Sequence, residues 1–204
     1  MKYLTAVLCA VFLAACGGGE PPPVSANIPL PFRLASPING DPEVALHLYQ
    51  ALYGRAPSYA QLNTFKSQIA ASGAVAWANS TAAGLSNLSN SAFATLVLNN
   101  ISITGTSLTG TALYGTPQQA YDGLLGGFVE YLNYVGIANR GVVAAQLAEI
   151  ISNLEVDTQF GVYGSAAVSF NHQTEANLAY ASDSTHTVDG IVMYPYFVTP
   201  PAPW

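Results

Sequence analysis

Acid–base or metal-binding chemistry in this chain would depend on three histidines, His47, His172 and His186. No two of them are four residues apart and no His-Glu-x-x-His motif is present, so the spacing that places two imidazoles on one helix face is missing. His47 falls on the first expected helix, where a solvated or packed histidine is far more common than a ligand, and we interpret it as a surface residue. The histidine pattern predicts no metal site.

Two carboxylates on expected helices, Glu130 and Glu149, are the candidates for a general acid and base. At about 100° per residue, Glu130 falls opposite the apolar stripe of residues 121–135 and is expected to be solvated. Glu149 lies beside the apolar stripe of its own helix, which predicts a position at the edge of a groove. A single carboxylate at such an edge does not make an active site.

Calcium binding would require oxygen ligands in a recognisable loop, and neither an EF-hand nor a Gly-Gly-x-Gly-x-Asp repeat is present. Asp183 and Asp189 flank a predicted turn, and Glu155 lies close to Asp157 near an expected helix end. The second pair has the oxygen atoms for a weakly bound ion, but an exposed helix terminus explains it equally well. Both interpretations stay open.

A serine nucleophile and a phosphate-binding loop are also missing from the sequence. Residues 105–109, Gly-Thr-Ser-Leu-Thr, lack the second glycine of the Gly-x-Ser-x-Gly elbow and follow no expected strand. No glycine-rich loop ends in Lys-Ser or Lys-Thr. The motif search therefore predicts a protein that is not an enzyme and holds no cofactor.

The most distinctive binding chemistry lies in the C-terminal residues, where aromatic side chains alternate with prolines. Aromatic rings on a stiff backbone can stack on sugars or fill a partner's pocket with little loss of conformational entropy. The alternative is a terminal strap that covers the helical core, since free tails this apolar favour aggregation. Both interpretations stay open for Tyr194, Tyr196, Phe197 and Trp204.

Cys16 has the sequence context of a covalent modification. It ends the tetrapeptide Leu-Ala-Ala-Cys, after a positive charge at Lys2 and an apolar run over residues 3–13 that is too short to span a membrane. This arrangement resembles the lipobox of bacterial lipoproteins, in which the signal peptide is removed and the cysteine carries lipid such as palmitate. The resemblance implies a signal peptide over residues 1–15 and a lipid anchor in the cell envelope. Gly17 after the cysteine, in place of aspartate, is similar to outer-membrane sorting.

The composition restricts the partners of the processed chain. Charged residues make up 8% of the sequence and hydrophobic residues 50%. Without Lys2 the formal charge moves from -6 to -7, and too few basic residues remain to bind a phosphate backbone, which disfavours nucleic acid. A surface with so few charges favours close packing against a protein or a glycan. The remaining basic residues are Arg33, Arg55, Lys66 and Arg140.

Helical elements must position these residues, and the sequence marks several helix ends. Asp-Pro and Thr-Pro pairs begin helices at Asp41 and Thr116, and Gly54 and Gly136 end helices. Asn139 can cap the next helix, and the short connection predicts that this helix lies antiparallel to its predecessor. The pattern predicts a mainly α fold.

The chain divides into four parts. Residues 1–15 form the signal peptide, and residues 16–40, rich in glycine and proline, form a tether. Residues 41–182 are expected to form a single bundle-like domain of about five to six helices. Residues 183–204 form either a short β-hairpin around the favoured turn Asp189-Gly190 or an extended, proline-rich tail.

One sequence motif resembles a known helical family. Residues 48–57, Leu-Tyr-Gln-Ala-Leu-Tyr-Gly-Arg-Ala-Pro, are followed by Leu62 and Phe65. They are similar to the opening of a domain of unknown function in bacterial secreted and surface proteins, which is itself similar to the start of phycobilisome linker domains. Tyr53 stands where that family has leucine. The resemblance covers residues 41–73 and implies a helical domain that supplies no catalytic residues.

Gly54, Arg55 and Pro57 in this motif have the chemistry of a helix corner. Glycine permits a left-handed turn, arginine can hydrogen-bond the last carbonyl groups of a helix, and proline stops the helix from continuing. We therefore expect a structural role for all three residues.

Together these patterns predict a non-catalytic, lipid-anchored cell-envelope protein with a structural or protein-interaction role. Its expected partners are the membrane, through the lipid on Cys16, and an envelope protein or a surface polysaccharide. The alternative function is a glycan- or peptide-binding module that uses the C-terminal aromatic residues.

Overall fold

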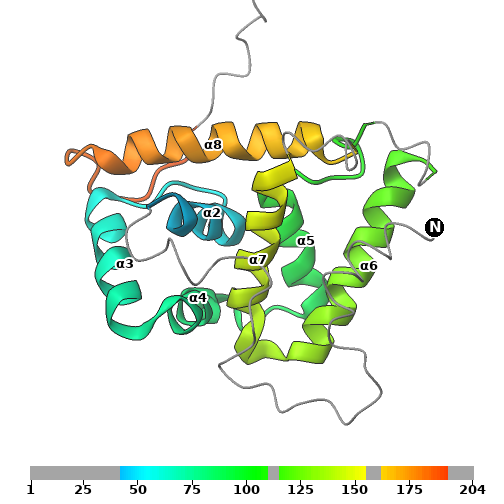
Figure 1. Cartoon of the computed structure of the whole chain (residues 1–204), viewed down its shortest axis with the longest axis horizontal. Coiled ribbons are helices and arrows are strands. Elements are labelled where there is room, and N and C mark those ends of the chain that lie inside the picture. Colours follow the sequence, from blue (N-terminus) through cyan, green and yellow to red (C-terminus); the bar gives the residue numbers. More distant parts are fainter. Residues whose placement is uncertain (1–41, 110–114, 155–161, 193–204) are drawn as a thin grey trace, which may run out of the picture.

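The computed structural model describes residues 42–109, 115–154 and 162–192 of the chain (Figure 1). The predicted signal peptide and tether, the expected cap at Asp41 and the predicted lipidation site at Cys16 lie outside these ranges. The candidate calcium pair and the aromatic tail also lie outside them, at Glu155, Asp157, Tyr194, Tyr196, Phe197 and Trp204.

The described residues are mainly helical, as the sequence predicts. They form seven α-helices, more than the five to six expected, because the short stretch after Gly73 forms a helix of its own. Two short 3-10 helices, η2 (Ala83–Leu85) and η4 (Ile137–Asn139), lie between them. The α-helices are α2 (Pro42–Tyr53), α3 (Tyr59–Ser72), α4 (Ala74–Ala82), α5 (Asn90–Asn100), α6 (Pro117–Val135), α7 (Arg140–Asn153) and α8 (Gly164–Ser182).

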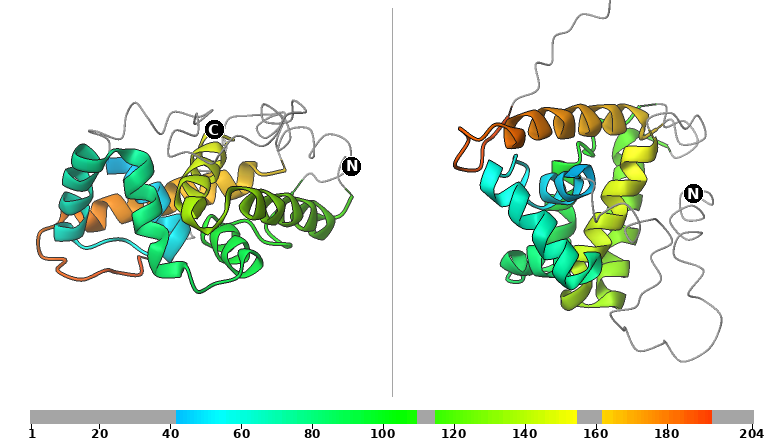
Figure 2. Two further views of the ribbon diagram at one scale, coloured as in Figure 1. Left: turned by 90° about the horizontal axis from the view of Figure 1, so that it is seen from below. Right: turned by 60° about the vertical axis from the view of Figure 1, so that its left-hand side comes forward.

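The first of these helices, α2, is the centre of the fold. Residues 44–52 are all buried, and α3, α4, α5, α7 and α8 all pack against this helix (Figures 1 and 2). Apolar residues at helical spacing, Ala45, Leu48, Tyr49 and Leu52, predict that one side of α2 is buried. Leu46 and Ala51 lie off this stripe and are also buried, so α2 is buried on more sides than the stripe predicts. None of the described helices combines the length and the apolar composition needed to cross a membrane.

The start of α6 uses the capping chemistry that the sequence predicts. Thr116 and Gln119 form a capping box. The backbone N–H of Gln119 donates to Thr116 Oγ1 at 3.2 Å, and the backbone N–H of Thr116 donates to the side-chain oxygen Oε1 of Gln119 at 2.9 Å. Pro117 occupies the first helical position. A backbone N–H at this position makes no hydrogen bond within the helix, so proline, which lacks one, costs nothing there. Gly136 ends the helix with a φ of 78°.

The start of α7 differs from the prediction. Asn139 precedes the helix, but its side chain donates to the carbonyl of Val135, the last residue of α6, at 2.9 Å and does not cap α7. The Val142 amide instead donates to Asn79 Oδ1, on α4, at 3.0 Å. The cap comes from another helix because α4 and α7 pack directly against each other.

Helices α6 and α7 run in opposite directions, as their short connection predicts, but they are not each other's main packing partners (Figure 1). Helix α6 packs mainly on α5, whereas α7 packs on α2, α4 and α8. Residues 140–148 of α7 are all buried, so the core takes up every side of this helix. Glu130 on α6 is exposed, as predicted.

The chain after α8 is extended and forms no hairpin within the described residues. Gly190 pairs instead with Ala56: the Ala56 amide donates to Gly190 O at 2.8 Å, and the Gly190 amide donates to Ala56 O at 3.0 Å. Figure 1 shows residues 183–192 turning back at the end of α8 toward the corner between α2 and α3. The extended alternative therefore holds for this segment, because the Asp189-Gly190 turn pairs with backbone far away in the sequence.

Candidate functional site

The structure brings His47 of α2 and Glu149 of α7 together. His47 Nδ1 lies 2.6 Å from Glu149 Oε1, and the two side chains are 5% and 18% exposed. The surface interpretation of His47 is wrong, because α2 is enclosed on all sides. Glu149, expected at the edge of a groove, lies at the contact between α2 and α7.

A paired imidazole and carboxylate can orient a general base, but this imidazole is enclosed. An ionised carboxylate only accepts hydrogen bonds, so His47 Nδ1 carries the hydrogen that is donated to Glu149. Phe170 of α8 packs on the ring, with centroids 5.2 Å apart and planes tilted by 36°. The other nitrogen, Nε2, is buried without a partner among the described residues. A base must reach the proton that it removes, so we assign this pair to the packing of α2 against α7.

Glu149→Ala should lower the free energy of unfolding by about 1–3 kcal/mol, because the buried imidazole N–H loses its acceptor. Glu149→Gln should cost clearly less, since the amide oxygen can still accept. Glu130→Ala, at an exposed site, is the matched control and should change stability by no more than about 0.5 kcal/mol. Urea denaturation followed by circular dichroism measures all three variants. Equal losses for the alanine and glutamine variants would contradict this role.

Sequence reasoning missed a buried network of amide side chains that joins three helices. Asn177 of α8 is fully buried, and its Nδ2 donates to Gln50 Oε1 of α2 at 2.8 Å. Gln50 Nε2 donates in turn to Asn100 O at the end of α5, at 3.0 Å. Gln173 donates to Asn177 Oδ1 and to Val192 O, which ties the chain after α8 to the network. No sequence motif marks these residues, because only packing brings them together.

Asp189 accepts hydrogen bonds from two groups near the start of the domain. Its Oδ1 accepts from the Ser58 amide at 3.1 Å, and its Oδ2 accepts from the Tyr49 hydroxyl. Burial and the hydrogen bond to the carboxylate raise the pKa of Tyr49. Asp183, on the other side of the predicted turn, accepts from Thr185, and this lowers its pKa. Among the described residues, no three His, Cys, Asp or Glu side chains converge as metal ligands.

The raised pKa of Tyr49 predicts sensitivity to alkali. The folded pKa lies above the unfolded value of about 10, so the folded state binds the phenolic proton more tightly. This stabilisation is complete below about pH 10 and is lost as the pH rises through the folded pKa. The free energy of unfolding should therefore fall above about pH 10, and Tyr49→Phe should flatten the decline. Denaturant titrations across this range measure both slopes, and identical slopes would rule out the effect.

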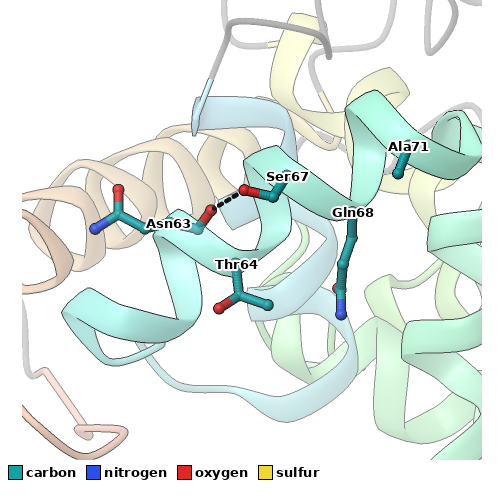
Figure 3. Close-up of a pocket in the computed structure, with 5 residues that line it drawn as sticks. All are labelled: Asn63, Thr64, Ser67, Gln68 and Ala71. Carbon is teal, nitrogen blue, oxygen red and sulfur yellow. Dashed lines mark hydrogen bonds between the residues drawn. The ribbon is translucent and has the colours of Figure 1, made fainter.

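The outer face of α3 carries a shallow groove of about 410 Å³ (Figure 3). Its side chains are neutral and exposed, and all but Gln68 are short. The Ser67 hydroxyl donates to Asn63 O and the Thr64 hydroxyl donates to Ala60 O, so both hydroxyls keep only acceptor capacity for a ligand. None of the described lining residues is titratable, so the groove suits contact more than chemistry. They are Asn63, Thr64, Ser67, Gln68 and Ala71.

Three large apolar side chains are exposed on the two segments that meet near the start of α3. Tyr59 is 40% exposed there, and Val188 and Ile191, on the chain after α8, are 69% and 83% exposed. The Tyr59 amide donates to His186 O at 3.0 Å, which joins the two segments. We call Tyr59, Val188 and Ile191 the corner patch. Apolar side chains exposed together mark contact surfaces.

Gly54, Arg55 and Pro57 lie where α2 turns into α3. Gly54 has a φ of 62°, in the left-handed region, and a Cβ atom there would lie 2.7 Å from Asn100 Oδ1. Arg55 is exposed, and its Nε donates to the carbonyl of Tyr53, the last residue of α2, at 3.4 Å. Pro57 is buried beside the turn. Gly54 permits the turn and the close approach of Asn100, and the hydrogen bond of Arg55 is local, which fits a corner.

Arg140, the first residue of α7, is a buried cation that sequence analysis did not single out. It is 3% exposed, and its guanidinium donates to Leu88 O and to Asn90 Oδ1 over distances of 2.5 to 2.8 Å. The guanidinium also lies 5.3 Å from the centroid of the Phe93 ring. Burial lowers the pKa of Arg140. These partners are neutral groups, and they attach α7 to the start of α5.

No protein-family model, curated protein or solved structure matches this chain. The resemblance of residues 41–73 to a helical family therefore stays a prediction. The aromatic tail lies outside the described residues, so its two interpretations also stay predictions. The geometry of the helical domain carries the functional argument.

Proposed function

We propose that this chain is a non-catalytic, lipid-anchored protein of the cell envelope, whose helical domain has a structural or protein-interaction role. The observation that carries the proposal is the corner patch, in which large apolar side chains are exposed on two hydrogen-bonded segments, the start of α3 and the chain after α8. Such patches mark protein contacts. The acid–base pair of His47 and Glu149, by contrast, is buried.

The groove on α3 supports the same role. Tyr59 begins this helix, so the groove and the corner patch share an element. The alanine, serine and threonine side chains lose little rotamer entropy when a partner covers them, and neutral side chains avoid the cost of desolvating a charge. Lys66 is the one charged residue of α3. A partner can therefore pack closely along this helix.

The lipid anchor is supported by the sequence around Cys16. Mass spectrometry of protein isolated from its native host should show a chain that begins at Cys16 and carries lipid. Cys16→Ser should release the chain from membranes, whereas Ser25→Ala, in the tether, should leave it membrane-bound. A bare thiol or a retained signal peptide would contradict the anchor.

Site-specific photocrosslinking in the native envelope tests the interaction role. A photoreactive residue in place of Ile191 should give a discrete crosslinked species, because this side chain is exposed in the corner patch. The same residue in place of Glu130, exposed on α6, is the control and should give much less. Equal crosslinking at both positions would contradict the proposal. So would an enzymatic activity that is lost when a single carboxylate residue is replaced. Glycan binding that requires Tyr196 and Trp204 would favour the alternative function.

A further inference from the structure

Residues 183–192, which we call the C-terminal strap, complete the corner between α2 and α3 (Figure 2). Gly190 and Ala56 exchange two backbone hydrogen bonds as an antiparallel bridge. The Tyr59 amide donates the third hydrogen bond, to the His186 carbonyl of the strap, at 3.0 Å. After a turn at residues 183–186, the strap therefore adds a segment to the backbone of the corner.

The strap covers the corner but buries little of itself. Ala56 and Ser58 of the corner are buried. None of the strap residues is buried, and the large apolar side chains of Val188 and Ile191 are exposed. A segment held by hydrogen bonds, with few buried apolar contacts, opens at a lower free energy than the core. The corner can therefore release the strap while the helices stay packed.

The corner also selects the side chains of the segment that it holds. The Asp189 carboxylate satisfies two donors on buried residues, the Tyr49 hydroxyl and the Ser58 amide. An apolar side chain at this position would leave the Ser58 amide unpaired and would leave the Tyr49 hydroxyl only its long contact to Gln61 Oε1, at 3.4 Å. Position 190 favours glycine, because a Cβ atom there would lie 2.4 Å from the ring of Tyr180, on α8, which would have to move. The corner and the neighbouring end of α8 thus fit aspartate followed by glycine.

We propose that the α2–α3 corner is a recognition site for an extended Asp-Gly segment of a partner protein, and that the C-terminal strap occupies this site until the partner displaces it. Addition of an extended segment to backbone groups is a common mode of peptide recognition. The Tyr49 hydroxyl and the Ser58 amide supply hydrogen-bond donors for the aspartate carboxylate of the partner. This inference rests on the protein-interaction role proposed above and names the chemistry of the partner, but it needs neither the lipid anchor nor the aromatic tail.

A peptide with the sequence of residues 185–192, Thr-His-Thr-Val-Asp-Gly-Ile-Val, tests the inference on the full-length chain in detergent. The attached strap competes at an effective concentration on the order of millimolar, so the wild-type chain should bind the peptide weakly. Asp189→Ala in the chain weakens this competitor, and fluorescence anisotropy should show binding at least about tenfold tighter. Peptides that carry Asp189→Asn or Gly190→Ala should bind that variant at least about tenfold more weakly.

Thr187→Ala, exposed on the strap, is the matched chain variant and should bind the peptide as the wild type does. Hydrogen exchange gives a second readout on the wild-type chain, in which the Ala56 and Tyr59 amides should exchange by local opening, faster than amides within α2. Equal affinity for the Gly190→Ala peptide, corner exchange only through global unfolding, or a strap-exchanged dimer in place of peptide binding would overturn the inference. Those results would leave crosslinking at Ile191 unchanged, so the two proposals fail separately.

Discussion

Replacement of Gly141 by alanine is expected to lower the free energy of unfolding by about 3 kcal/mol or more. An alanine Cβ at this position would lie 2.0 Å from the Ala78 carbonyl oxygen and 2.7 Å from Asn79 Cα. Both are backbone atoms of α4, so no side-chain rotation relieves the contact and the two helices must move apart. Because α7 also packs on α2 and α8, this shift disturbs much of the core. Chemical denaturation followed by circular dichroism measures the loss.

Gly126→Ala is the matched control for this substitution. A Cβ atom at Gly126, within α6, meets no atom within 4 Å. Alanine has the higher helix propensity, so the control should be stabilised by roughly 0.5–1 kcal/mol. A Gly141→Ala chain as stable as the wild type would show that α4 and α7 do not cross at this distance.

Arg140→Ala is expected to lower the free energy of unfolding by about 2–3 kcal/mol. The substitution removes the guanidinium hydrogen bonds to Leu88 O and Asn90 Oδ1, and it also removes the side chain that packs over Phe93. Arg140→Lys should restore only part of the loss, because a single ammonium cannot reproduce the forked geometry that reaches both acceptors. Thermal and urea denaturation measure the three chains.

Arg55→Ala provides the control for loss of an arginine. Arg55 is exposed and makes one long hydrogen bond at the corner, so its removal should change stability by no more than about 0.5 kcal/mol. Similar losses at Arg55 and Arg140 would show that burial of the second guanidinium does not matter. Full rescue by Arg140→Lys would show that the positive charge at position 140 stabilises the fold and that the planar guanidinium geometry is not needed.

Local chemistry makes the helical layout predictable from sequence. The capping box at Thr116 and the helix ends at Gly54 and Gly136 depend on residues within a few positions of each other, so their physics is complete within a short stretch of chain. The cap of α7 does not come from neighbouring residues in the sequence. It is supplied by Asn79, more than a helix away in sequence, and only the contact between α4 and α7 brings it to the Val142 amide.

The candidate sites depend on contacts that are remote in sequence. His47 and Glu149 are 102 positions apart, and Tyr49 and Asp189 are 140 apart. A stripe of apolar residues predicts that one side of α2 is buried, but it cannot show that other helices cover the remaining sides. This is why His47 was expected at the surface and why the Asp189-Gly190 turn was expected to join a hairpin.

By itself, the sequence determined the mainly α class, the helix ends at Gly54, Thr116 and Gly136 and the exposure of Glu130, because each depends on the order of neighbouring side chains. It also predicts a lipid anchor at Cys16 from an equally local motif. Only the tertiary structure decided that His47 and Arg140 are buried and that the strap pairs with the α2–α3 corner. Burial and long-range pairing arise from the simultaneous packing of many helices, which no single stretch of sequence contains.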